Sequence, residues 1–141
     1  MSGKAFLDTN ILIYLYSEDE PRKMKISQQA INSYDCVIST QVLNEFSNVC
    51  IKKLDKTIDE IKLAIYEITN GFSLAAIDKE TIIIALDIHK KYNYSYYDSL
   101  IAASALLSKC TYLLSEDLSD GQVIENQLKI VNIYRHNINE K

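Results

Sequence analysis

Short apolar runs alternate with longer stretches of helical periodicity along this chain. The runs are mostly apolar, are bounded by polar residues, and occupy residues 4–7, 36–38, 72–77, 112–115 and 130–133. Apolar runs of this length are typical of buried β-strands. The stretches between them are long enough for helices, so the pattern predicts strands and helices in alternation.

The helical stretches carry apolar residues at positions i, i+3 or i+4, and i+7. This stripe is clearest after Ser39-Thr40, where it consists of Val42, Leu43, Phe46, Val49 and Cys50. Further helices are predicted at residues 11–16, 22–33 and 57–69, after Asp78, and from Ser95 onward. Alternation of this kind predicts an α/β fold, a three-layer sandwich in which helices flank a central, mostly parallel sheet.

Length and composition indicate a single globular domain. The chain has 141 residues, and we predict a single domain over residues 1–141. The longest uninterrupted apolar stretches are only a few residues, which excludes a membrane-spanning helix. No apolar signal-peptide region precedes Asp8, so a cytoplasmic location is expected.

The cysteines and histidines are few and widely spaced. Cys36, Cys50 and Cys110 are odd in number and lie among apolar residues, so we interpret them as small core residues, not as disulfide partners. His89 and His136 are the only histidines, and no zinc-ligand spacing is present. We expect each histidine to be a surface or half-buried residue.

Asp98 stands at the start of the least polar helical segment, residues 97–107. A helix that is apolar on nearly every side belongs inside a domain, and a carboxylate there is costly unless something pairs with it. One interpretation is structural: Ser95-x-x-Asp98 is a capping box, with Asp98 favouring the helix N-terminus. The other interpretation is that Asp98 belongs to a functional site. It is favoured because other acids have a similar placement.

Three further acids are expected near the same edge of the sheet. Asp8 directly follows the first predicted strand, and Asp117 follows the strand that ends near Ser115. Glu45 borders the apolar stripe of its helix, at about 40° from Val49 on a helical wheel. Each acid alone can be explained as a helix cap or a half-exposed surface residue. Ligands of open α/β sheets bind at the carboxyl edge, so the joint placement of all four predicts a site there.

Four carboxylates gathered without a cation repel one another and raise one another's pKa. A hard divalent ion relieves that repulsion, and an all-oxygen site without Cys or His suits Mg²⁺ or Mn²⁺. Such sites bind phosphate oxygens and activate water for attack on phosphorus. The pattern therefore indicates phosphate chemistry.

The net charge of −4 is compatible with a nucleic-acid substrate. If four of the 19 acids form one metal site, the remaining 15 balance the 15 Lys and Arg residues. Basic clusters that would then face phosphates are Arg22-Lys23-x-Lys25, Lys52-Lys53 with Lys56, and Lys90-Lys91. Each cluster alone is also explained as a solvated helix end.

Three segments and one helix position together resemble a known family. The segments are Phe6-Leu7-Asp8-Thr9-Asn10-Ile11-Leu12-Ile13-Tyr14, Tyr96-Tyr97-Asp98-Ser99-Leu100-Ile101, and Leu114-Ser115-Glu116-Asp117-Leu118 with Asp120-Gly121. Glu45, in Val42-Leu43-Asn44-Glu45-Phe46, occupies the place of the family's second acid. In this order, which spans nearly the whole chain, the motifs resemble those of PIN-domain ribonucleases of the VapC type, the toxins of toxin–antitoxin pairs.

The resemblance implies roles for individual residues. Asp8 and Asp98 would be the principal ligands of Mg²⁺ or Mn²⁺, and Glu45 and Asp117 would complete the site through the metal or its waters. Polar positions of the family map onto Asn10 and Ser115, which would support the acids or contact substrate. The chain departs from the family at Tyr97, where Trp is frequent, and the adjacent Glu116 leaves open which of Glu116 and Asp117 faces the metal.

The resemblance implies an endoribonuclease in which a metal-activated water attacks the scissile phosphate, with Glu45 or Asp117 accepting its proton. Two alternatives stay open at this stage. One is a phosphotransferase with Asp8 as nucleophile, although haloacid-dehalogenase-like enzymes have Asp-x-Asp where this chain has Asp8-Thr9-Asn10. The other is a non-catalytic module whose acidic pocket binds a basic peptide.

Proteins of this type usually form homodimers and are inhibited by a small antitoxin that lays a segment across the acidic pocket. The first predicted helix carries more apolar residues than one buried stripe needs: Ile11, Leu12, Tyr14, Leu15 and Tyr16. We expect some of them to be exposed in the monomer and available to a second chain. An inhibitory segment is expected to offer Arg or Lys to the four acids.

Overall fold

The central sheet follows the order β3-β2-β1-β4-β6-β5. The structure is a computed structural model and describes residues 3–135. Its strands are β1 (Lys4–Leu7), β2 (Asp35–Ser39), β3 (Ser73–Ala75), β4 (Tyr112–Leu114), β5 (Val123–Ile124) and β6 (Leu128–Val131). Every neighbouring pair is parallel except β5 and β6, which are antiparallel. The predicted mostly parallel sheet is therefore confirmed.

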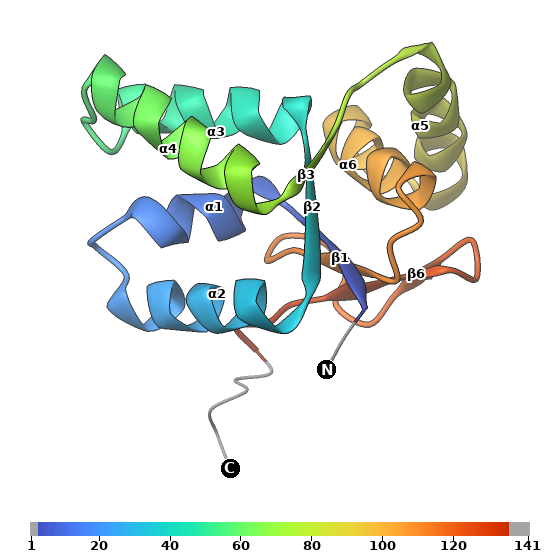
Figure 1. Ribbon diagram of the computed structural model, residues 1–141. Helices are drawn as coiled ribbons and strands as arrows, with labels where there is room; N and C mark the ends of the chain where they lie inside the picture. Colours follow the sequence, from blue (N-terminus) through green and yellow to red (C-terminus); the bar gives the residue numbers. More distant parts are fainter. Residues whose placement is uncertain (1–2, 136–141) are drawn as a thin grey trace.

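Helices cover both faces of this sheet (Figure 1). They are α1 (Thr9–Tyr16), α2 (Pro21–Ser33), α3 (Thr40–Lys52), α4 (Ile58–Gly71), α5 (Lys79–Tyr92) and α6 (Tyr96–Leu107). The helices α1 to α4 lie on one face, and α5 and α6 lie together on the other (Figure 1). The three layers agree with the predicted α/β sandwich.

The end of the sheet differs from the sequence prediction. The last strand begins at Leu128 and not near residue 130, and the two-residue strand β5 was not predicted. The hairpin between them turns through Glu125 and Asn126, both at positive φ. Positive φ at both central positions is typical of the tight turns of hairpins, but it is usually signalled by Gly. Without that signal, and with so short a strand, the hairpin was missed.

The core forms around β1 and β4, the two inner strands that the rest of the sheet flanks. Phe6, Leu7, Leu113 and Leu114 have no exposed surface. The three cysteines are free and buried, as predicted. His89 is exposed, also as predicted, whereas His136 lies outside the described residues. Within residues 3–135, no helix is long and apolar enough to span a membrane.

The middle of helix α6 is buried, as its apolar sequence predicted. Its buried residues run from Ser99 to Ala105, and they include small residues that allow close packing against the sheet and α5. The Ser95 hydroxyl caps the helix by accepting a hydrogen bond from the backbone N–H of Asp98, at 3.1 Å. This is half of the predicted capping box, because the return bond from the Asp98 side chain to the Ser95 backbone is not formed. The Asp98 carboxylate is thus not used as a backbone cap.

The order of strands fixes where a site can form. From β1 the chain moves to β2 and β3 on one side, and β4 returns to pair with β1 on the other. The segments that leave the carboxyl ends of β1 and β4 therefore start side by side, where the strand order reverses and a crevice can form. Asp8 follows β1 and Asp117 follows β4, so both acids lie at this crevice.

Candidate active site

One pocket at the carboxyl edge of the sheet collects all four predicted acids. Its volume is about 310 Å³, and it is lined by Asp8, Thr9, Asn10, Ile13, Glu45, Asn48, Val49, Asp98 and Asp117. The acids come from four separate parts of the chain: the start of α1, the middle of α3, the first turn of α6 and the loop after β4. The structure thus brings together residues that the sequence separates by more than one hundred positions.

Asp8 is the most buried of the four, with 8% of its surface exposed. Its Oδ1 caps α1 by accepting a hydrogen bond from the backbone N–H of Thr9 at 2.7 Å. Its Oδ2 accepts a hydrogen bond from the Ser115 hydroxyl at 2.8 Å. Burial is the largest influence and raises the pKa of Asp8 to about 6; the two hydrogen bonds lower it, and the charges of Asp98 and Glu45 raise it further. Asp8 is therefore both the expected helix cap and a member of the pocket.

Asp98 is half-buried at the opposite wall of the pocket. Burial is again the largest cause of its raised pKa, the Ser95 hydroxyl opposes the shift, and the charges of Asp117 and Glu45 add to it. The pKa values of Asp8 and Asp98 are therefore raised mainly by burial, and the repulsion expected for crowded carboxylates adds to that effect.

Glu45 is held at both carboxylate oxygens. The Thr9 hydroxyl donates to Oε1 at 2.5 Å, and the Gln41 side-chain amide donates to Oε2 at 3.1 Å. Thr9 belongs to α1, whereas Gln41 lies one helical turn before Glu45 on α3. These two donors fix the direction of the Glu45 side chain toward the pocket.

The loop after β4 separates Asp117 from Glu116. Asp117 lines the pocket, and its Oδ2 accepts a hydrogen bond from the Asn10 amide at 2.9 Å. Glu116 points away, to Lys23 Nζ at 2.5 Å and the Tyr14 hydroxyl at 2.6 Å. Of the two acids, Asp117 therefore faces the pocket, and Glu116 anchors the loop to α1 and α2.

Ser115 connects the first and last acids. Its hydroxyl donates to Asp8 and lies 3.3 Å from the backbone N–H groups of Asp117 and Leu118, which donate to it. Ser115 has no exposed surface, which favours a supporting role over contact with substrate. Asn10 is half-buried and lines the pocket beside Asp117.

Sequence reasoning missed Thr9 and Gln41 as part of this site. A signal for Gln41 was present, because residues four apart on a helix are neighbours and Gln41 precedes Glu45 by four. Thr9 gave no such signal, since its contact with Glu45 spans 36 positions and depends on the packing of α1 against α3. Asn48, which also lines the pocket, lies on α3 three residues after Glu45.

The oxygen atoms of these side chains suit a hard divalent ion. As the side chains stand, no group of three or more Asp, Glu, His or Cys residues between positions 3 and 135 is arranged as around a metal ion. In this arrangement Asp8 accepts a hydrogen bond from Ser115, Glu45 from Gln41, and Asp117 from Asn10. The carboxylate oxygens have the chemistry that a divalent ion requires, and three of the acids are held by hydrogen bonds from protein side chains.

The predicted basic clusters are only partly free to meet phosphates. Lys23 is paired with Glu116, and Lys91 is paired with Glu125 at 2.8 Å. Arg22 donates to the backbone carbonyl of Tyr134 at 3.2 Å. The exposed Lys52 and Lys53 end α3, the helix that carries Glu45, which places that cluster on the same element as the pocket.

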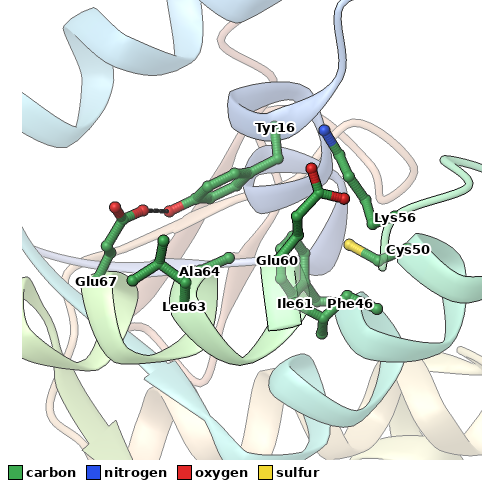
Figure 2. A pocket seen from close by; sticks show the side chains of 9 residues that line it. All are labelled: Tyr16, Phe46, Cys50, Lys56, Glu60, Ile61, Leu63, Ala64 and Glu67. Atoms are coloured by element: carbon green, nitrogen blue, oxygen red, sulfur yellow. Dashed lines mark hydrogen bonds between the residues drawn. The ribbon is translucent and has the colours of Figure 1, made fainter. Parts of the chain in front are cut away.

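A second pocket is apolar and lies between α1, α3 and α4 (Figure 2). Its volume is about 180 Å³, and its lining includes Tyr16, Phe46 and Leu63. The ring of Tyr16 contacts Phe46 edge-on at 5.4 Å, and its hydroxyl donates to Glu67 at 2.9 Å. The helices α1 and α3 line both this pocket and the acidic one, so the two pockets are neighbours.

The expected exposure of the first helix is wrong. Ile11 and Leu12 have no exposed surface, and Tyr14, Leu15 and Tyr16 are half-buried against the core. The reason is that α1 packs against both α2 and α3, so it needs a wider apolar surface than a helix with one neighbour. Exposed large apolar side chains lie elsewhere, at Ile51, Ile58, Leu63, Tyr66, Leu74, Ile82, Ile83, Leu86, Tyr97, Leu107 and Val123.

Comparisons with known proteins agree with this geometry. A family model described as the PIN domain matches residues 5–119. A search of curated proteins gives no match. Among solved structures, a toxin–antitoxin complex from Klebsiella pneumoniae is similar with a TM-score of 0.69 and 21% identity, over 90% of this chain and 95% of that chain.

Two further solved structures are similar in fold. VapBC2 from Rickettsia felis, bound to a DNA fragment from its promoter, matches with a TM-score of 0.66 and 16% identity, over 90% of this chain and 98% of that chain. VapC20 from Mycobacterium tuberculosis, a toxin that cleaves the sarcin-ricin loop, matches with a TM-score of 0.66 and 14% identity, over 80% of this chain and 91% of that chain. At these identities the likeness shows a shared fold.

The raised pKa of Asp8 generates a prediction about stability. Because its pKa rises from 3.8 to about 6 on folding, the folded protein binds this proton more tightly than the unfolded chain. The resulting stability is fully present below about pH 4 and is lost as pH rises through about 6, with a total near 3 kcal/mol. In metal-free solution, the parent is therefore expected to lose about 3 kcal/mol of unfolding free energy relative to Asp8→Asn between about pH 4 and pH 7.

Urea denaturation at several pH values, with a chelator present, measures this difference. Asp87→Asn, on the exposed part of α5, is the matched control and is expected to follow the parent. A pH dependence of Asp8→Asn that is identical to that of the parent would show that Asp8 is not the titrating group.

Proposed function

Because the chain belongs to the PIN-domain family, we propose that residues 1–141 form one domain that acts as a divalent-metal-dependent endoribonuclease. We further propose that it is the VapC-type toxin of a toxin–antitoxin pair. The observation that carries the proposal is the convergence of Asp8, Glu45, Asp98 and Asp117 on one pocket at the carboxyl edge. The fold shared with toxins of known structure supports it.

Asp8 and Asp98 are proposed as the principal ligands of Mg²⁺ or Mn²⁺, with Glu45 and Asp117 completing the site directly or through water. Their raised pKa values support this, since a carboxylate that is costly to ionise alone gains most from a cation. A bound divalent ion would supply Lewis-acid chemistry to the phosphodiester. Water-bridged binding is compatible with the observed spacing, because Mg²⁺ usually keeps several of its waters.

Asp117 is the better placed of the two acids to accept a proton from the attacking water. Both oxygens of Glu45 already accept hydrogen bonds, from Thr9 and Gln41. Asp117 is exposed, and among the described residues only its Oδ2 has a side-chain donor, Asn10. Proton transfer needs an oxygen that can reach the water, which favours Asp117.

The geometry also bears on the alternatives. A nucleophilic Asp8 would need an accessible oxygen, but each of its oxygens accepts a hydrogen bond and the side chain is buried. A metal ligand would have to meet the same condition, so trapping of an aspartyl-phosphate is the observation that separates the two roles. A module that only binds a basic peptide would use the same acids but would not cleave RNA. The cleavage assay therefore separates it from an enzyme.

The proposed antitoxin would occupy the apolar pocket and reach the acidic one. Leu63 on α4 is 60% exposed at the rim of the apolar pocket, and Glu60 and Glu67 add negative charge there. An amphipathic segment with Arg or Lys is complementary to this combination. A guanidinium placed among the acids could replace the charge of the metal with bidentate hydrogen bonds.

A homodimer is also proposed, but through a different surface from that of α1. Three large apolar side chains are exposed close together on α5: Ile82, Ile83 and Leu86. They lie on the face of the sheet opposite to the apolar pocket, because α5 and α4 cover opposite faces (Figure 1). A second copy of the chain bound at α5 would leave the antitoxin surface free.

The first functional prediction concerns Asp98. Asn keeps the shape of the side chain and leaves the Ser95 cap intact, but it removes the charge proposed to bind metal. Asp98→Asn is expected to fold like the parent and to lose RNA cleavage by at least about 100-fold. Cleavage of total RNA with and without Mn²⁺ or Mg²⁺ measures this, with Asp87→Asn as control.

The same proteins test the metal by thermal denaturation. Millimolar Mn²⁺ is expected to raise the melting temperature of the parent and of the control, but much less that of Asp98→Asn, because the ion binds only the folded site. Full cleavage by Asp98→Asn, or an unfolded variant, would remove Asp98 from the proposed ligands. Trapping of a phosphorylated Asp8 would favour the phosphotransferase instead.

The antitoxin prediction uses charge reversal and an apolar substitution. Asp98→Lys places a cation where the partner's basic residue is proposed to bind, and Leu63→Glu disrupts the rim of the apolar pocket. Both are expected to weaken binding of the cognate antitoxin at least about tenfold. Calorimetry on co-expressed and separated proteins measures this, and Asp87→Lys is the charge-reversal control. Unchanged affinity of Asp98→Lys would show that no basic residue binds among the acids.

The dimer prediction uses the opposite face of the molecule. Light scattering at micromolar concentration is expected to give twice the chain mass of 16.1 kDa. Leu86→Glu places a charge in the α5 patch and is expected to give a monomer that still binds antitoxin, whereas Leu63→Glu is expected to stay dimeric. A parent that is strictly monomeric would refute the dimer, and a dimeric Leu86→Glu would refute this interface.

A further inference from the structure

Gln41 links two walls of the acidic pocket through a single side-chain amide. It lies in the first turn of α3 and is 8% exposed. Its Nε2 donates to Glu45 Oε2 at 3.1 Å and to the backbone carbonyl of Tyr97 at 3.1 Å. Tyr97 immediately precedes Asp98 in the first turn of α6. One amide group therefore contacts the Glu45 carboxylate and the backbone that carries Asp98.

This link is placed where the two helix layers can meet. The helices α3 and α6 belong to opposite faces of the sheet, so the sheet itself lies between most of their lengths (Figure 1). They can approach each other only beyond the carboxyl ends of the strands, where both begin. Within residues 3–135, no other side-chain hydrogen bond joins α3 to α6. The distance between the two walls is consequently sensitive to this contact.

The two acids that Gln41 connects repel each other. The charge of Glu45 contributes to the raised pKa of Asp98, which places the two carboxylates within electrostatic range. Without a tie, like charges on two separate helices would move apart. The other oxygen of Glu45 is fixed by Thr9, so Gln41 adds the one tie between Glu45 and the wall of Asp98.

The amide group of Gln41 is bonded through its nitrogen. Its orientation is fixed, because Nε2 is the atom that can donate to both acceptors. The carbonyl oxygen Oε1 is then buried without a hydrogen-bond partner among the described residues. An unpaired buried acceptor destabilises a fold. An apolar side chain of similar size would remove this cost, and it would also remove both hydrogen bonds.

We propose that Gln41 is a positioning residue that sets the separation of Glu45 and Asp98 and thereby the affinity of the pocket for a divalent cation. The inference rests on the proposed metal-dependent function, because it assigns the same pocket to the cation. It concerns a residue that touches neither the cation nor the substrate. Its effect is expected in the binding of the ion and not in the stability of the metal-free fold.

The test compares Gln41→Met with Gln28→Met. Met matches the length of Gln but cannot donate, and Gln28 is an exposed position on α2 that serves as control. Calorimetric titration of the full chain with Mn²⁺ is expected to show about 10- to 100-fold weaker binding for Gln41→Met, the range typical of groups that orient metal ligands. Gln28→Met is expected to bind like the parent, and a cooperative metal-free melting transition of Gln41→Met checks that this variant is folded.

A second variant keeps the proposal testable if Gln41→Met does not fold. Gln41→Asn keeps the amide but is one methylene shorter, so it cannot reach both acceptors and is also expected to weaken Mn²⁺ binding. RNA cleavage by either variant is expected to recover at saturating Mn²⁺. Parent-like affinity in a folded Gln41→Met or Gln41→Asn would overturn the proposal, as would a loss of cleavage that persists at full occupancy. A parent that binds no Mn²⁺ would instead refute the proposed metal-dependent function.

Discussion

The burial and mutual repulsion of clustered carboxylates are the constraint around which the carboxyl edge of this sheet is organised. Asp8, Glu45, Asp98 and Asp117 line one pocket, and each is approached by donors that belong to the protein. These donors are a backbone N–H and hydroxyl of Thr9, the hydroxyls of Ser95 and Ser115, and the amides of Asn10 and Gln41. They are all neutral, so they orient the carboxylates without cancelling their charge. Lys23 is bound to Glu116, which points away from the pocket.

These hydrogen-bond donors come from several elements because several segments of the chain meet at this crevice. Strand order reverses at β1, so the segments after β1 and β4 meet there, and the first turns of α3 and α6 reach the same edge from opposite faces. Ser115 connects Asp8 with the turn that carries Asp117, and Gln41 connects Glu45 with the turn that carries Asp98. Thr9 and Asn10 add two further links, from α1 to Glu45 and to Asp117. Small changes at Ser115 or Gln41 would alter distances between acids without touching the core.

The sequence predicted the parts of this arrangement that depend on local signals. Asp8 and Asp117 follow apolar runs, and Asp98 opens a helix that is apolar on every side, so their common edge followed from the alternation of strands and helices. Contacts between distant segments could not be predicted from the sequence. Glu116 points away from the pocket because it pairs with Lys23, which lies 93 positions before it in the sequence. The burial of Ile11 and Leu12 likewise depends on α1 having two helix neighbours, which no count of apolar residues in one helix reveals. The β5–β6 hairpin was missed because its turn lacks glycine.

The protein's donors orient the acids but do not neutralise their charge. This explains why the pocket should accept more than one kind of cation. Neutral donors leave the pKa of Asp8 raised to about 6 and that of Asp98 raised as well, so the folded chain retains an unfavourable electrostatic energy at neutral pH. Any cation that enters the pocket recovers part of this energy, whether it is a metal ion or the guanidinium of a bound peptide. The two would compete for the same carboxylates, and each would stabilise the folded chain by binding it. Catalysis and inhibition would then rest on one electrostatic property, the charge that the protein's own donors leave uncompensated.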